Sequence, residues 1–336
     1  MNALNPDLPP VETSALPDYK DRSTGLMIFG ILTILIGCMT GMMLLFTLVT
    51  LLAASHTNVP PTSLSALLPA LFIYGILAVA LIWLGIGSIK ARRWARALLL
   101  IFSWTWLVMG VFAILGVVLV LPTFLESIRA AAPPGQPAMP AAAIGVAMVI
   151  ACLMIGVFFI ALPAVWIFFY NSRHVKATCE ARDPVTRWTD ACPLPVLGLC
   201  LWLVVSAPMM LAMPLMGHGV MPFFGTFLTG QAGTAFCLAI AALWAWCAWL
   251  LYKMDVRGWW VILCAVVLFA VSAVLTYSQH DIIEMYQLMG YPQAQIDLIQ
   301  KSGLLTGNRM VWITSFSMVP YLGYILFVKQ FLRGKS

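Results

Sequence analysis

The feature that most constrains this chain is a series of long apolar runs that contain almost no charged residues. A helix rises about 1.5 Å per residue, so roughly 20 apolar residues are needed to cross the hydrocarbon of a bilayer. Eight runs reach about that length: Gly25–Ala54, Leu67–Ile89, Ala97–Leu121, Ala141–Tyr170, Pro195–Met216, Thr234–Tyr252, Trp259–Tyr277 and Met310–Phe331. Backbone polar groups cannot stay unpaired in lipid, and these runs lack the alternating pattern of barrel strands. The sequence therefore predicts an all-α, polytopic membrane protein with eight transmembrane helices.

The composition supports the same interpretation. Charged residues make up only 9% of the 336 residues and hydrophobic residues 62%, whereas a soluble domain carries about 25% charged residues. So few charges cannot cover a water-soluble surface of this size, and lipid must be the solvent for most of the chain. The polar, proline-rich residues 1–24 are expected to form a disordered cytoplasmic tail.

The distribution of positive charge predicts how the helices are oriented. An even number of spans places both termini on one side, together with the second, fourth and sixth loops. Of the 18 Lys and Arg residues, only Arg129, Lys301 and Arg309 fall on the other side. Since Lys and Arg accumulate in cytoplasmic segments, we expect cytoplasmic N- and C-termini, in the inner membrane if the source is bacterial. The same bias explains the net charge of +6 without a nucleic-acid partner.

Three short matches, in the same order along the chain, indicate an internal duplication. They pair Met42-Met43-Leu44 with Met209-Met210-Leu211, Arg92-Arg93-Trp94 with Arg257-Gly258-Trp259, and Pro163 followed by Lys176 with Pro320 followed by Arg333. Because each half would contain an even number of spans, the two halves would have the same orientation, as in a parallel repeat. We therefore expect two four-helix halves, at residues 25–170 and 195–336, joined by a cytoplasmic linker at residues 171–194.

This linker is polar and has a structural interpretation along its whole length. We expect its first part to extend the fourth helix and to end before Asp183, because the residue that precedes a proline avoids the helical region. The fifth helix should begin near Pro193, where a missing N–H group costs little. The linker also contains His174, Cys179 and Cys192, but it lacks the close cysteine pair typical of zinc sites, so no metal is predicted there.

The best candidate metal ligands lie on the opposite, outer side. His280 and Glu284 are four residues apart, so a helix places them on one face, and Asp281 is adjacent to His280. His56 and His218 lie in other outer loops and could complete a coordination shell. Imidazole and carboxylate groups suit zinc or another divalent cation. The alternative is that these side chains only make the outer loops soluble, because a metal site would require three separate loops to meet.

Other chemistries find little support in the sequence. No Asp, Glu, Lys, Arg or His lies well inside an apolar run, which argues against a proton pump or a charge-coupled transporter. There is no HExxH motif, phosphate-binding loop or GxGxxG motif, so no cofactor is predicted. The long outer loop, residues 278–309, is expected to form two short surface helices. The stretch from Gly37 to Gly41 is a GxxxG motif, which permits close helix packing and would allow a homodimer.

These features favour a non-enzymatic integral membrane protein that binds an apolar ligand or a membrane protein partner. The charge-free interior and 19 methionines support this interpretation, because methionine-rich surfaces adapt to varied apolar ligands. A transporter of a neutral or lipid-like substrate is the first alternative, favoured by the repeat and by prolines inside spans. An outer-surface, metal-dependent enzyme that uses His280, Asp281 and Glu284 is the least supported. The expected partners are membrane lipid and, in addition, a membrane protein or a second copy of the chain.

A reporter fused after Lys335 tests the predicted orientation. Because the positively charged loops and the C-terminus share one side, we expect a reporter that matures only in the cytoplasm to be active there. A reporter that requires export should be active when it is inserted in a segment predicted to lie outside, such as residues 131–140. An exported reporter that is active at the C-terminus would contradict the orientation.

Overall fold

The computed structural model describes residues 19–54, 64–130, 141–217, 219–302 and 308–332. Among these residues, eight helices are long and apolar enough to cross a membrane, which confirms the predicted number of spans and the all-α membrane class. The spans are α1 (Ser23–Ala54), α2 (Leu64–Ile89), α3 (Arg93–Ala130), α4 (Ala141–Gly156) continued through the π-helix η1 (Val157–Ala161) into α5 (Leu162–Asn171), α7 (Leu194–Gly217), α8 (Gly230–Tyr252), α9 (Val256–Gln279) and α12 (Asn308–Leu332).

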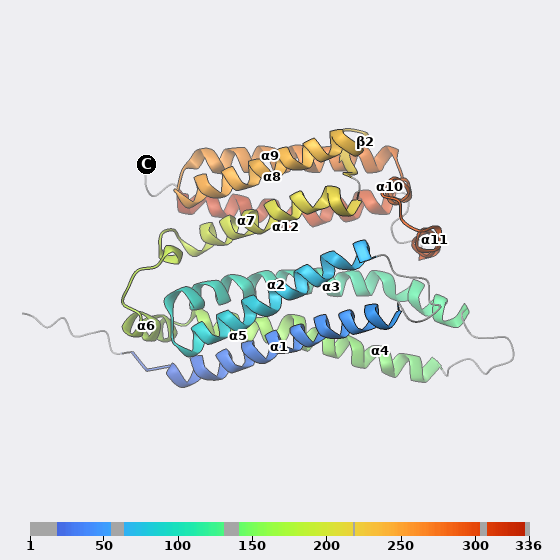
Figure 1. Ribbon diagram of the computed structural model, residues 1–336. Helices are drawn as coiled ribbons and strands as arrows, with labels where there is room; N and C mark the ends of the chain where they lie inside the picture. The colour runs from blue at the N-terminus through green and yellow to red at the C-terminus, as the bar shows by residue number, and fades with distance from the viewer. Residues whose placement is uncertain (1–18, 55–63, 131–140, 218, 303–307, 333–336) are drawn as a thin grey trace, which may run out of the picture.

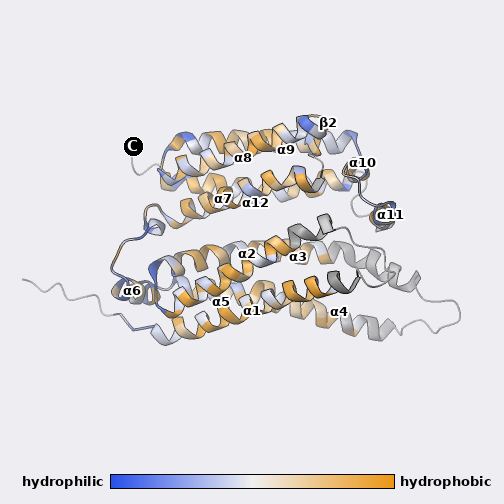
Figure 2. Ribbon diagram, viewed as in Figure 1, coloured by the Kyte–Doolittle hydropathy of each residue, from blue (hydrophilic) through white to orange (hydrophobic). Residues whose placement is uncertain are grey.

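The spans lie side by side in two groups, with α1 to α5 in one and α7, α8, α9 and α12 in the other (Figure 1). Apolar residues cover the middle of the helices, and polar residues gather at the two ends (Figure 2). We call one end the linker end: it carries α6 (Arg173–Arg182), η2 (Trp188–Asp190) and the short α2–α3 and α8–α9 loops. The opposite, hairpin end carries β1 (Met221–Phe223), β2 (Thr226–Leu228), α10 (Ile282–Leu288) and α11 (Gln293–Ser302).

Each group has a buried core of its own. The core of the first contains Leu26, Trp166 and Tyr170, whereas the core of the second contains Trp259 and Ile262. Contacts between the groups run along α2 and α3, which both meet α7. Isolated side chains cross this seam, among them Ile101 of α3, which packs against the second core. The two cores are therefore joined along a narrow contact.

Glycines bring α1 and α2 unusually close together. A Cβ atom on Gly30 would lie 2.8 Å from the carbonyl oxygen of Gly85, and a Cβ atom on Gly85 would lie 2.7 Å from the carbonyl oxygen of Gly30. Gly37, in the predicted GxxxG motif, faces Ala78 and Ile82 of α2 in the same way. Small residues let helix backbones approach where lipid supplies no hydrophobic drive. The motif is therefore used inside the chain, and the homodimer stays a prediction.

The fourth span changes helix type where proline interrupts it. Pro163 has no N–H group to donate to the preceding turn, and the turn before it is the π-helix η1, in which the Leu162 amide bonds to the Val157 carbonyl. Gly110 of α3 packs directly against the Phe159 backbone, where a Cβ atom would overlap the Phe159 carbonyl oxygen. A glycine on the neighbouring helix thus makes room for the widened turn.

The linker departs from the sequence prediction at its beginning. The fourth helix does not continue into it: α5 ends at Asn171, and Ser172 has an extended ψ of 135° before α6 starts. The physical reason is the burial of Val175 and Cys179, which are 0% and 1% exposed in the core of the first group. A straight extension would carry both side chains away from that core into water. The predicted end before Asp183 and the start of α7 beside Pro193 are confirmed.

The linker cysteines do not form a common site. Cys179 lies in the core of the first group and Cys192 in the core of the second. Burial raises the pKa of each thiol to about 11, so neither presents the thiolate that metals and oxidants require. His174 bonds through Nδ1 to the Lys20 amide, at 3.3 Å. These residues help to hold the linker in place.

A buried carboxylate attaches the linker to the α2–α3 loop. The Asp183 side chain is 1% exposed, and its Oδ1 lies 3.3 Å from the guanidinium nitrogens of both Arg92 and Arg187. Its Oδ2 accepts a hydrogen bond from the Arg93 amide at 3.4 Å. Burial favours the neutral form of Asp183, but the hydrogen bonds from Arg187 and Arg93 and the charges of Arg187 and Arg92 outweigh it. The pKa of Asp183 therefore lies below its ordinary value of 3.8.

Replacing Asp183 with Asn tests this attachment. We expect the free energy of unfolding to fall by about 1–2 kcal/mol, because charge-assisted hydrogen bonds are lost while both arginines are exposed enough to be rehydrated. Since the folded pKa is depressed, the contribution of Asp183 is complete above pH 3.8 and is lost as the pH falls further. Denaturant unfolding in detergent at neutral and acid pH measures both effects.

The matched control is Glu180→Gln, which removes a carboxylate that is 42% exposed and whose nearest cations lie at 3.8 and 3.9 Å. This change should cost about 0.5 kcal/mol or less, as for other exposed pairs. Equal losses in the two variants would show that burial of Asp183 adds nothing to the attachment.

Candidate functional site

The structure brings together two of the predicted outer residues at the hairpin end. His280 follows the last residue of α9, and Glu284 lies in the first turn of α10. His280 Nδ1 and Glu284 Oε2 are 2.8 Å apart, so the predicted proximity of these side chains is confirmed. Both groups face solvent in part, with side-chain exposures of 33% and 47%. The pair lies where the span α9 meets α10 at the hairpin end.

The second nitrogen of the His280 ring contacts a different element. Its Nε2 lies 3.0 Å from the backbone carbonyl oxygen of Gly225, in the turn between β1 and β2. A carbonyl oxygen only accepts hydrogen bonds, and an ionised Glu284 carboxylate does the same. The imidazole therefore has an acceptor oxygen beside each of its two nitrogens. His280 thus connects the hairpin to α10.

The other predicted metal ligands do not join this pair among the described residues. Asp281 is the N-cap of α10, and its carboxylate accepts a hydrogen bond from the Ile283 amide at 3.3 Å. His56 and His218 lie outside the described residues. Within the described part of the chain, no three His, Cys, Asp or Glu side chains are grouped so that they could hold a metal ion. The metal site stays a prediction. The contacts of His280 in the described residues connect α10 to the β1–β2 turn.

The sequence analysis missed the hairpin itself. Strands β1 and β2 are antiparallel, with Phe223 opposite Thr226 and a two-residue turn between them. The turn residues Phe224 and Gly225 have φ angles of 40° and 90°, which is the pattern of a type I′ turn. The pattern that could have predicted this hairpin is the glycine flanked by apolar and aromatic residues in MPFFGTFL, because a short turn between such residues is typical of a hairpin. Positive φ is strained for a bulky residue such as Phe224, so neighbouring groups must hold the turn.

Two hydroxyl groups of α9 supply that support. Ser272 Oγ accepts a hydrogen bond from the Phe224 amide at 2.9 Å, and Thr276 Oγ1 accepts one from the Gly225 amide at 3.1 Å. Both hydroxyl residues are buried, at 4% and 0% exposure, and both belong to the span Val256–Gln279. Thr276 Oγ1 also donates a hydrogen bond to the Ser272 carbonyl of its own helix, at 2.8 Å, so it supports both the helix and the strained turn.

This end of the molecule presents an aromatic tip rather than a catalytic centre. Phe223 and Phe224 are 36% and 49% exposed and pack edge to face with each other. Both nitrogens of His280 already have partners, so the ring does not offer a free general base to a substrate. The arrangement positions the hairpin on α9 and α10.

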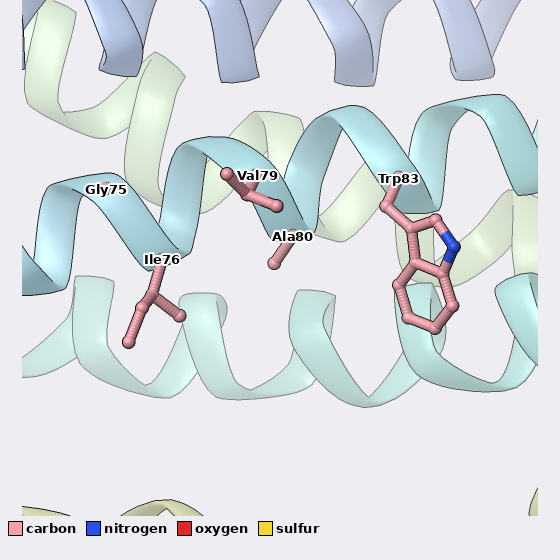
Figure 3. Close-up of a pocket in the computed structure, with 5 residues that line it drawn as sticks. All are labelled: Gly75, Ile76, Val79, Ala80 and Trp83. Atoms are coloured by element: carbon pink, nitrogen blue, oxygen red, sulfur yellow. The ribbon is translucent and has the colours of Figure 1, made fainter.

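Two apolar depressions lie on the spans. One, about 340 Å³ in volume, runs between α7 and α8 and is lined by Trp188, Leu197, Cys200, Leu201, Val204, Ala207, Ala245, Ala248, Trp249 and Tyr252. The other, about 420 Å³ in volume, is an open hollow along one helix, α2 (Figure 3). Its lining residues are Gly75, Ile76, Val79, Ala80 and Trp83. Because the first is bounded by two helices and the linker, it has the more defined shape.

Comparison with known proteins adds no further assignment: no family model matches the chain, and neither a curated protein nor a solved structure matches it.

Substituting Thr276 with Val tests the support of the hairpin. The change keeps the shape of the side chain but removes the acceptor of the Gly225 amide. We expect amide hydrogen exchange in residues 221–228 to become about tenfold faster, as for the loss of about 1.4 kcal/mol. The control is Ser278→Ala, because the Ser278 hydroxyl is exposed and bonds the Leu275 carbonyl of its own helix. Unchanged exchange in the Thr276 variant would exclude this role.

Proposed function

We propose that this protein is a non-enzymatic membrane protein that binds an apolar, chain-shaped molecule in the groove between α7 and α8. The observation that carries the proposal is the groove itself, which is about 340 Å³ in volume and has no ionisable carboxylate, amine or imidazole in its lining. Ligand pockets of about this volume accommodate small molecules. Cys200 and Tyr252 supply the most polar side chains of the lining, so an apolar ligand is favoured.

The linker closes one end of this groove. The Tyr252 hydroxyl donates a hydrogen bond to the Trp188 carbonyl at 3.1 Å. The Trp188 and Trp249 side chains, which are 47% and 58% exposed, stand beside that contact. An acyl chain entering from the bilayer would therefore meet a closed end near the interface. Because the hydrophobic effect does not drive association of apolar surfaces within lipid, the groove must select its ligand by close van der Waals contact with the shape of that ligand.

The distribution of charge in the spans supports binding rather than ion coupling. In the eight spans, Asp, Glu, Lys, Arg and His occur only within the first or last four residues. Intramembrane ionisable residues are the usual elements of proton relays and ion paths. The positive residues gather at the linker end, so we propose that this end and both termini face the cytoplasm.

We further propose that the two groups of helices are parallel repeats. In the first group α1 packs against α2 and α3 against α5; in the second α7 packs against α8 and α9 against α12. The short loops at the linker end also match in conformation. Ala91 and Met254 have φ angles of 50° and 62°, although neither is a glycine. In each loop the next amide, that of Arg92 or Asp255, bonds the carbonyl five residues back, at 2.9 and 3.0 Å, as in a Schellman motif.

The same register extends into the following helix. Arg96 and Trp259 are each five residues beyond the left-handed residue of their loop. Arg96 Nε donates to the Tyr170 carbonyl at 2.9 Å, and Trp259 Nε1 donates to the Ile325 carbonyl at 2.7 Å. In both groups the third span is thus bonded to the backbone of the fourth. The equivalent residues of the two groups are 163 positions apart in the sequence. This offset is two positions shorter than the offset between the Arg92-Arg93-Trp94 and Arg257-Gly258-Trp259 motifs.

Transport of a neutral or lipid-like substrate is the second candidate. The observation that favours it is the narrow seam between two separately packed cores, because small interfaces between units permit relative movement. Distances between labels on α2 and α8 that change when ligand is added would support transport; a single distance distribution would favour simple binding.

Filling the groove tests the binding proposal. Ala245 is exposed and lines the groove from α8, so Ala245→Phe should displace an apolar ligand. We expect retention of the ligand, measured by native mass spectrometry after gentle extraction, to fall about tenfold, since roughly ten atom contacts of about 0.1–0.2 kcal/mol each are lost. The control is Ala242→Phe, at an exposed position of the same helix that does not line the groove. Equal retention in the two variants would reject the groove as the site.

A further inference from the structure

The ammonium group of Lys329 is held in a defined place at the linker end of α9 and α12. Its Nζ lies 4.4 Å from the ring centroid of Trp259 and 4.7 Å from that of Trp260. Trp259 is 1% exposed and is fixed by its hydrogen bond to the Ile325 carbonyl. A cation–π contact attracts the ammonium but does not neutralise its charge or occupy its N–H donors. Lys329 is therefore positioned in advance for an anion.

A second cation, Arg257, and the indole of Trp260 belong to the same region of the surface. Arg257 is exposed and lies three residues before Trp260 on α9, a spacing that places both side chains on one face. Trp260 is 52% exposed, and no described residue accepts a hydrogen bond from its indole N–H. The three side chains together offer guanidinium, ammonium and indole donors on one patch of surface.

The charge balance at this patch differs from that of the first group. There, the linker carboxylates Glu180, Asp183 and Asp190 each lie within 4 Å of an arginine or lysine. At the linker end of α8 and α9 the acidic residue in the described part of the chain is Asp255, and its carboxylate caps the α9 N-terminus. Neither Arg257 nor Lys329 forms an ion pair with another described residue. Both cations are therefore available to an anion from outside the described chain.

The depth of the patch indicates the source of that anion. Arg257 and Lys329 each lie within the terminal turn of a span, and the exposed Trp249 and Trp260 lie beside them near the same end. Tryptophan favours the level of the lipid headgroups, where phosphate groups are concentrated. We infer that Arg257, Trp260 and Lys329 form a binding site for the phosphate group of an anionic phospholipid.

The same residues explain a preference for an anionic over a zwitterionic headgroup. A guanidinium binds phosphate oxygens through parallel N–H groups, and an ammonium adds a compact charge. A zwitterionic lipid would bring its own cation near Lys253, which is exposed in the adjoining loop and would repel it. The Asp255 carboxylate, which could otherwise attract that cation, already caps the N-terminus of α9. This site does not depend on the α7–α8 groove and requires only that the helices span a bilayer.

The experiment uses the full chain in nanodiscs of equal parts phosphatidylglycerol and phosphatidylcholine with identical acyl chains. Native mass spectrometry then counts the lipids that each variant retains. We expect the wild type to retain phosphatidylglycerol preferentially, and Lys329→Gln or Arg257→Gln to reduce that preference roughly tenfold. Lys329→Arg, which keeps the charge and the contact with the indoles, should preserve it. The control is Lys176→Gln, at the same end, because Lys176 already lies 3.9 Å from Glu180.

Three outcomes would overturn the inference: equal retention of the two lipids by the wild type, an equally large loss of preference in Lys176→Gln, or loss of preference in Lys329→Arg. Displacement of phosphatidylglycerol by millimolar inorganic phosphate would assign the site to the free anion and reject the lipid. Quenching of Trp260 fluorescence by a headgroup-labelled anionic lipid provides a second measurement if a glutamine variant does not fold. That quenching should be lost in Trp260→Phe, and unchanged quenching there would also reject the site.

Discussion

The need to pair every backbone hydrogen-bonding group inside lipid is the constraint on which this structure depends. Eight helical spans satisfy that need within themselves, and the departures from regular helix each have a local solution. At η1, where Pro163 lacks an N–H group, the turn widens and Gly110 makes room for it. At the β1–β2 turn, the hydroxyls of Ser272 and Thr276 accept hydrogen bonds from the turn amides. Irregular backbone thus occurs where side chains or neighbouring helices compensate for it.

Charge is arranged around the same constraint. Ionisable side chains are excluded from the middle of the spans and concentrate at their ends, where water or headgroups solvate them. At the linker end the two groups of helices treat their cations differently. The first group pairs Arg92 and Arg93 with the carboxylates of the linker, including the buried Asp183. The second group leaves Arg257 and Lys329 without a carboxylate from the described chain, and so directs that surface toward the bilayer.

The proposed repeat allows these differences between the two groups of helices to be interpreted. Equivalent loops with left-handed residues at Ala91 and Met254 support a common origin, so the features that differ between the halves are the ones available for function. The linker covers the first half, whereas the α7–α8 groove, the aromatic hairpin and the lysine above its indoles belong to the second. On this basis we propose that the second half binds the ligand and that the first half anchors the linker.

The sequence by itself determined the membrane class, the spans and the end of α6 before Asp183, because hydrophobic length and proline chemistry are local properties. It also predicted that His280 and Glu284 lie close together, although the expected reason, a shared helix face, was wrong, because His280 has extended backbone before the start of α10. What only the tertiary structure decided was which distant groups meet: Gly225 with His280, Ser272 with the hairpin, Lys329 with Trp259. It also decided that α6 breaks from α5, because the burial of Val175 and Cys179 depends on a core assembled from helices far apart in the chain. Such contacts arise from packing between spans, and no local pattern encodes them.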